Sequence, residues 1–257
     1  MPYLEFTPSA QLQHLIESYW ISETFEGVHA HKILPDGCMD ILFNLGEEIH
    51  SEALGQVSSI PKYGVSIVGM MTRFSEISMK PQGKALGIRF RPGQFSKLTG
   101  IPLSHFRNEL INANEILPKI QNLPFEQLFQ LTDPRQQIRL LEQEFYNTFQ
   151  VHIPGKNSLV TSVTDFILEA SSPVKVQETA KVHGISVRQL ERVFQNQVGV
   201  TAKEFASIIR FKRTLRQIAL QPEKSLLHIA FENGYYDHAH LTREFKKFSG
   251  ISPSTFR

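Results

Sequence analysis

Three side chains near the C-terminal end of the sequence, Asp237, His238 and His240, are of the types that bind metal ions. The same residues could begin a helix, because Asp is a preferred N-cap residue. Two histidines two positions apart diverge by about 200° on a helix, whereas helical metal pairs are three or four residues apart. The following "LTREFKKF" favours a helix over a strand. We therefore expect a helix to start here and no metal to bind.

This helix belongs to a repeat of about 50 residues. Segments 176–205 and 226–256 align when one extra residue is allowed in the second turn. The matching pairs are Ala180 and Ala230, Gly184 and Gly234, Leu190 and Leu241, Arg192 and Arg243, Phe194 and Phe245, Gly199 and Gly250, Thr201 and Ser252, and Phe205 and Phe256. The self-similarity predicts two copies of one structural unit.

Each copy contains the parts of a helix-turn-helix. A small alanine allows two helices to cross closely, and a glycine four residues later suits the left-handed end of the first helix. Ser186 or Asp237 then supplies a polar N-cap for the second helix. We predict the two motifs over about 176–198 and 225–248.

The second helix of each copy has one apolar face and one polar face. The predicted buried residues are Leu190, Val193 and Phe194 in the first copy and Leu241, Phe245 and Phe248 in the second. The predicted outer residues are Arg188, Arg192 and Gln195 in the first copy, and Ala239, Arg243 and Lys246, flanked by His240 and Thr242, in the second. Arg pairs bidentately with guanine and Gln with adenine, so these faces suit double-stranded DNA.

The segment between the copies, 201–220, contains no Gly or Pro and predicts one long helix. Twenty helical residues span about 30 Å, close to the roughly 34 Å repeat of DNA. Residues 155–257 carry a charge of +6 and residues 1–154 a charge of −4, which together give the net +2. A basic C-terminal part is typical of a module that binds a polyanion. The alternative is an ordinary helical bundle whose basic residues are solvated.

The N-terminal half has a different pattern. Short strand candidates separated by Gly and Pro predict a β-rich core over about 30–92, as an antiparallel barrel or sandwich. Residues 94–150 are predicted to be helical. Asp133 and Pro134 have the types expected at the start of a helix. Pro154 and Gly155 then mark a linker, assigned to 151–156.

The C-terminal part, 157–257, resembles the DNA-binding domain of AraC/XylS-type transcription regulators. The resemblance rests on "LERVF", "GVTAKEF" and "IAFENGYYDHAHLTREFKKFSGISPSTFR", with Leu241 where the family often has phenylalanine. It implies seven helices, of which the third and the sixth enter adjacent major grooves. The implied base-facing residues are Arg188, Glu191 and Arg192 in the first recognition helix and His238, Ala239, His240 and Arg243 in the second. Glu191 either accepts from a cytosine amino group or pairs with a neighbouring arginine.

The N-terminal half, with "ILPDGCMDILFNLG" and "LGIRFRPGQF", is similar to the cupin-like sensory domains of part of this family. Such domains bind an effector or mediate dimerisation. His29 and His31 would share one face of a strand, but no matching downstream ligand pair is evident, so a surface position is favoured over a metal site. Cys38 lies in an apolar run, which favours a buried structural thiol over a reactive one.

Together these observations predict an α+β protein of two domains. Residues 1–150 would sense a signal or pair subunits, and residues 157–257 would bind promoter DNA. The expected function is sequence-specific transcription regulation, with activation through RNA polymerase as the mode that the resemblance implies, and a small-molecule effector. No apolar run approaches the roughly 20 residues of a membrane helix, so we expect a cytoplasmic protein with no membrane partner.

Two alternatives remain for the N-terminal half. It could act only as a homodimerisation domain, through the 134–150 helix. It could also be a small-molecule enzyme fused to a DNA-binding module, but no convergent set of titratable groups can be assembled from the sequence. We therefore expect no catalytic residue and no cofactor.

Overall fold

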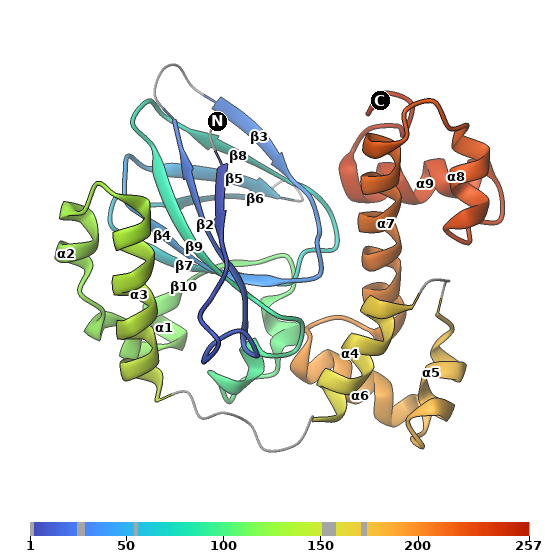
Figure 1. Cartoon of the computed structure of the whole chain (residues 1–257), viewed down its shortest axis with the longest axis horizontal. Coiled ribbons are helices and arrows are strands. Elements are labelled where there is room, and N and C mark those ends of the chain that lie inside the picture. Colours follow the sequence, from blue (N-terminus) through green and yellow to red (C-terminus); the bar gives the residue numbers. More distant parts are fainter. Residues whose placement is uncertain (1–2, 25–28, 54–55, 151–157, 171–173, 257) are drawn as a thin grey trace.

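The computed structural model describes residues 3–24, 29–53, 56–150, 158–170 and 174–256. The chain forms a β-rich N-terminal half and a helical C-terminal half, as the sequence predicts, and the two lie side by side (Figure 1). None of the helices in the described residues is both long enough and apolar enough to cross a membrane.

The strands form two antiparallel sheets. They are β1 (Tyr3–Phe6), β2 (Ile16–Glu23), β3 (His29–Ile33), β4 (Met39–Asn44), β5 (Ile49–Ala53), β6 (Gln56–Ile60), β7 (Val65–Val68), β8 (Ser75–Met79), β9 (Lys84–Phe90) and β10 (Leu110–Asn112). One sheet has the order β1-β2-β9-β4-β7-β10 and the other β3-β8-β5-β6. The predicted barrel or sandwich is confirmed, but β1 and β2 precede the expected β-rich region and β10 follows it.

The six-stranded sheet buries both of its faces. In β4, Met39, Ile41 and Phe43 lie in the main hydrophobic core, on the side covered by the helices that follow the strands. The alternate residues Asp40 and Leu42 line a cavity on the other side. Successive side chains of a strand point to opposite faces, so this cavity lies between the two sheets.

Short helices and one long helix follow β9. They are η1 (Phe95–Lys97), η2 (Leu103–Phe106), α1 (Ala113–Ile116), η3 (Pro118–Asn122), α2 (Phe125–Gln130) and α3 (Pro134–Phe149). Asp133 caps α3, because its side chain accepts a hydrogen bond from the Arg135 N–H, and Pro134 is the first helical residue. Both features are as predicted. The predicted linker, 151–156, lies outside the described residues.

The C-terminal helices are α4 (Leu159–Glu169), α5 (Val176–Val182), α6 (Val187–Gln197), α7 (Ala202–Leu220), α8 (Leu226–Glu232) and α9 (His238–Ser249). These six are the helices of this half within the described ranges, so α6 is the third and α9 the sixth. The predicted long helix is α7, and Figure 1 places α5 and α6 near one end of it and α8 and α9 near the other.

The two halves share one hydrophobic core, which includes Leu103 and Phe106 of η2 together with Val160 of α4 and Phe194 of α6. Polar contacts reinforce this interface. Gln94 Nε2 donates to Thr161 Oγ1 at 2.8 Å. Arg107 Nη2 forms an ion pair with Glu204 Oε1 at 2.6 Å. A change in one half therefore has direct routes into the other.

Candidate nucleic-acid interface and internal cavity

The first helix-turn-helix consists of α5 and α6. Ala180 is buried where the two helices meet, and Gly184 has φ +66°, in the left-handed region. The Ile185 N–H then donates to the Ala180 carbonyl at 3.0 Å, which closes the turn. Ser186 caps α6 in a capping box with Gln189, so two N–H groups at the helix start are satisfied reciprocally.

The second helix-turn-helix, α8 and α9, repeats this geometry. Gly234 has φ +73°, and the Tyr235 N–H donates to the Ala230 carbonyl at 2.9 Å. Asp237 caps α9, since its Oδ1 accepts from the His240 N–H at 2.6 Å. The duplicated unit and the helical start at His238 are therefore confirmed.

The predicted apolar faces of α6 and α9 point inward. Leu190 and Phe194 are fully buried in α6, and so are Leu241, Phe245 and Phe248 in α9, each at 1% exposure or less. The opposite faces are open to solvent. The exposed residues are Arg188, Arg192 and Gln195 on α6 and His238, Ala239, Arg243 and Lys246 on α9. Within the described part of the chain, none of the four cationic side chains among them forms a hydrogen bond or ion pair with another residue.

Three other residues of the predicted interface have internal partners. Glu191 Oε2 accepts from the Ala202 N–H at 3.0 Å and so joins α6 to the start of α7. His240 Nδ1 accepts from the Tyr236 N–H at 3.2 Å, and Thr242 Oγ1 donates to the His238 carbonyl at 2.9 Å. In this structure Glu191 therefore pairs with a backbone N–H group and not with a neighbouring arginine.

Helix α7 fixes the separation of the two units. Thr201 caps it in a capping box with Glu204, and its 19 residues span about 28 Å. Near the middle of α7, Arg210 holds α9 in place, because its Nε donates to Glu244 Oε1 at 2.9 Å and its guanidinium lies 4.6 Å from the Tyr235 ring centroid. The second helix of each unit, α6 or α9, is thus joined to α7 by a hydrogen bond to a glutamate carboxylate.

A groove of about 440 Å³ lies against α7 between the two units. Its basic lining residues differ in their partners. Arg213 Nη2 donates to the Ile167 and Leu168 carbonyls at the end of α4, at 2.8 and 2.7 Å. The Lys203 side chain is exposed to solvent. Lys203 was not among the residues selected from the sequence.

The cavity between the two sheets has a volume of about 150 Å³ and mostly apolar walls. At one end Asp40 is buried, and its Oδ2 accepts from Trp20 Nε1 at 2.9 Å and from Arg89 Nη2 at 3.1 Å. The Trp20 ring lies against Gly87, where any side chain would collide with the indole. Burial raises the pKa of Asp40, although Arg89 opposes the shift.

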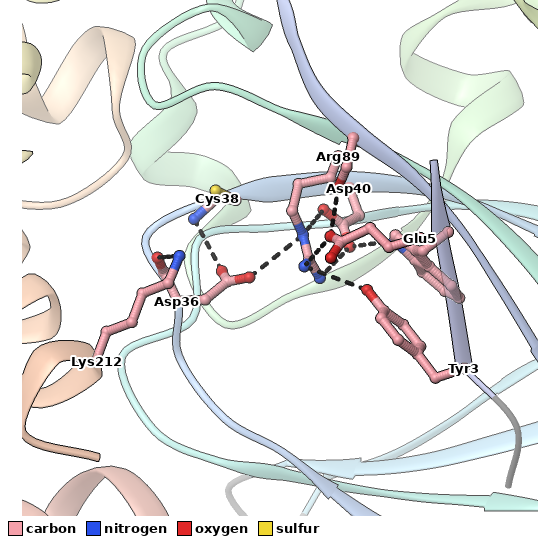
Figure 2. Close-up of polar contacts among 9 residues, drawn as sticks. Tyr3, Glu5, Asp36, Cys38, Asp40, Arg89 and Lys212 are labelled. Carbon is pink, nitrogen blue, oxygen red and sulfur yellow. Dashed lines mark hydrogen bonds and ion pairs between the residues drawn. The ribbon is translucent and has the colours of Figure 1, made fainter. Parts of the chain in front are cut away.

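A polar path leads from this end of the cavity to α7 (Figure 2). Arg89 Nε contacts Asp36 Oδ2 at 3.3 Å, and the Asp36 carbonyl accepts from Lys212 Nζ at 3.5 Å. Gly37, with φ +87°, brings the turn against α7 so closely that a Cβ there would lie 2.9 Å from Ile209 Cδ1. The segment Pro35, Asp36 and Gly37 thus links the cavity wall to the long helix.

Cys38, which follows this turn, is buried, and burial raises the pKa of its thiol. The prediction of a buried structural cysteine is therefore confirmed. Of the histidine pair weighed as a metal site, the His29 side chain lies outside the described residues and His31 is half-buried. The described residues contain no group of three or more His, Cys, Asp or Glu side chains that could hold a metal ion.

A second contact joins the cavity to α9. Phe74 lines the cavity and also lies beside Gly250, the C-cap of α9. Gly250 has φ +75°, and a Cβ there would lie 2.6 Å from Phe74 Cε1. Lys32 Nζ lies 4.5 Å from the centroid of the same ring.

Two capped helix-turn-helix units on one rigid helix, packed against a β-rich half with an internal cavity, define a two-domain helix-turn-helix DNA-binding protein. Residues 179–257 match the family described as "Helix-turn-helix domain", and residues 4–112 match the family described as "Domain of unknown function (DUF6597)". The chain is similar to "Probable transcription factor PqrA" of Proteus vulgaris, with 33% identity over 92 residues that cover 35% of this chain and 73% of the relative.

It is also similar to "HTH-type transcriptional regulator ArgR" of Pseudomonas aeruginosa, with 31% identity over 108 residues, 39% of this chain and 32% of the relative. The chain thus spans about a third of the length of that regulator and of others it matches. A structure of ToxT from Vibrio cholerae bound to (E)-4-(8-methylnaphthalen-1-yl)but-3-enoic acid has the same overall fold, with a TM-score of 0.51, 10% identity, and coverage of 100% of this chain and 98% of ToxT. The chain belongs to the AraC/XylS family of transcription regulators.

Proposed function

We propose that this regulator binds a promoter site with α6 and α9 in adjacent major grooves. The observation that carries the proposal is the pair of exposed, cationic faces on α6 and α9, two helices that lie near opposite ends of α7 (Figure 1). The roughly 28 Å length of α7 is compatible with the roughly 34 Å between successive major grooves on one side of DNA. The proposed boundaries of the DNA-binding part are those expected from the sequence, residues 157–257.

The residues proposed to read bases are those whose side chains are exposed. Arg188, Arg192 and Gln195 would act from α6, and His238, Ala239, Arg243 and Lys246 from α9. Glu191 and His240 were also expected to face the bases, and Thr242 was expected to flank the outer face of α9. Their internal hydrogen bonds support a role in positioning the two helices instead.

The test measures the affinity of the full chain for its promoter fragment at fixed salt concentration. Arg192→Ala or Arg243→Ala should weaken binding by about 1–3 kcal/mol, which is roughly 5- to 150-fold. Lys62→Ala is the matched control, because it removes the same charge from an exposed position in the β-rich half. Unchanged affinity in both arginine variants would contradict the assignment.

We also propose that the β-rich half, residues 1–150, binds a small-molecule effector in the cavity between its sheets. The cavity supports this proposal, and so does the ToxT structure, which was solved with a bound organic acid. We propose a binding role and no catalysis for this half. The ligand would signal through the turn at Asp36 and Gly37 to α7 and through Phe74 to the end of α9.

Activation of transcription through RNA polymerase in the cytoplasm is the mode that we propose for the DNA-bound protein. The alternative role for the β-rich half is dimerisation without ligand binding. A mass near twice 29.3 kDa in solution, with no small molecule that changes the melting temperature, would favour that alternative.

A further inference from the structure

The size of the cavity between the sheets limits what it can hold. Its volume of about 150 Å³ equals that of an engineered apolar cavity that binds benzene. Leu42, Ile49, Ile77 and Met79 supply much of the lining, with the Trp20 ring at one side. A single six-membered ring fits such a space.

The buried charges in the cavity wall neutralise each other. Asp40 and Arg89 form a buried ion pair, and each carboxylate oxygen of Asp40 already accepts a hydrogen bond from Arg89. The other two charged residues of the lining, Arg73 and Glu109, are exposed and opposite in sign. A charged ligand inside the cavity would find no uncompensated partner among the buried lining residues and would have to be desolvated, which is unfavourable.

One polar group of the cavity wall lacks a partner. Ser22 on β2 is 3% exposed, and within the described residues its Oγ forms no hydrogen bond. By contrast, Ser18, four positions earlier on the same face of β2, donates its hydroxyl to Glu5 Oε1 at 2.7 Å. A buried hydroxyl without a partner costs free energy, which a ligand with one hydrogen-bonding group can recover.

We propose that the cavity binds an uncharged molecule with a single apolar ring and one hydroxyl or carbonyl substituent, which hydrogen-bonds to Ser22 Oγ. This inference rests on the proposed effector role of the cavity and specifies the ligand class. It differs from the two-ring carboxylic acid bound to ToxT, because Arg89, the buried cation of the lining, is already paired with Asp40.

The test uses the full chain with three probes of equal size that differ in charge: benzyl alcohol, benzoate and benzylamine. Benzyl alcohol should raise the melting temperature and bind in calorimetry, and the two charged probes should bind at least about 10-fold more weakly. Equal or tighter binding of benzoate or benzylamine would overturn the proposal, and so would the absence of benzyl alcohol binding.

Two variants locate the bound probe. Ser22→Ala should weaken benzyl alcohol binding by about 3- to 10-fold, whereas Ser18→Ala should leave it unchanged. Ala85→Leu should abolish binding, because Ala85 is a small, buried lining residue. An unchanged affinity in Ser22→Ala, or an equal loss in Ser18→Ala, would refute the proposed contact.

Promoter affinity is measured for each protein with and without benzyl alcohol. If the probe fails to bind while promoter affinity is normal, the ligand class is wrong and the DNA-binding function stands. If the probe binds without any change in promoter affinity, the ligand class is right and the effector role fails.

Discussion

The contact between Phe74 and Gly250 yields the sharpest prediction on communication between the two halves. Replacing Gly250 by Ala should destabilise the folded protein in two ways, through backbone strain and through overpacking. An L-residue in the left-handed region costs about 1–2 kcal/mol. A Cβ 2.6 Å from Phe74 Cε1 overpacks the interface, which costs about 1–3 kcal/mol more. We expect Gly250→Ala to lower the free energy of unfolding by about 2–5 kcal/mol.

A control variant and a double variant separate these costs. Gly184 has φ +66° and no atom within 4 Å of an added Cβ, so Gly184→Ala should show only the backbone cost. Phe74→Ala removes the ring, so the double variant should recover about 1–3 kcal/mol relative to the sum of the single variants. The free energies are measured by urea denaturation of the full chain. A coupling energy below about 0.5 kcal/mol would show that Phe74 does not press on the end of α9.

Three further predictions concern charges and caps. Burial raises the pKa of Glu204, but the hydrogen bonds from Thr201 and the charge of Arg107 outweigh burial, so the pKa is lowered overall. The ionised Glu204 carboxylate therefore contributes its full stability above the ordinary pKa of 4.5. That stability should be lost as the pH falls through the lower folded value, and the pH dependence should shrink in Glu204→Gln when melting temperatures are compared. Asp237→Ala should destabilise the protein by about 1 kcal/mol in urea denaturation through loss of the α9 cap, and an unchanged stability would refute that role. Arg89→Met should cost about 3–5 kcal/mol in the same assay because it leaves Asp40 buried without its cation, and a loss below 1 kcal/mol would contradict the ion pair as described.

The C-terminal half could be predicted closely because its signals are local. Each turn is fixed by a glycine with positive φ, Gly184 or Gly234, and each following helix by its N-cap residue, Ser186 or Asp237. All four residues act on neighbours a few positions away in the sequence. The helical period then determines which face of α6 and of α9 is buried.

The cavity and its connections could not be predicted in this way. Asp40 lies opposite Arg89 only because β4 pairs with β9 in one register, and Ser22 lies opposite Ala85 for the same reason on β2. The Phe74 contact with Gly250 joins residues from different halves of the chain. The internal partner of Glu191, the Ala202 N–H, depends on the angle between α6 and α7. Such pairings depend on tertiary packing, which a periodic pattern does not encode.

The proposal that one protein engages two successive major grooves is tested most directly by methylation protection of guanine N7 on the bound promoter. Two protected clusters are expected on one face of the duplex, about 10 base pairs apart. Arg192→Ala should remove protection in one cluster and Arg243→Ala in the other. A single cluster that both variants weaken equally, or two clusters on opposite faces of the DNA, would contradict the proposal.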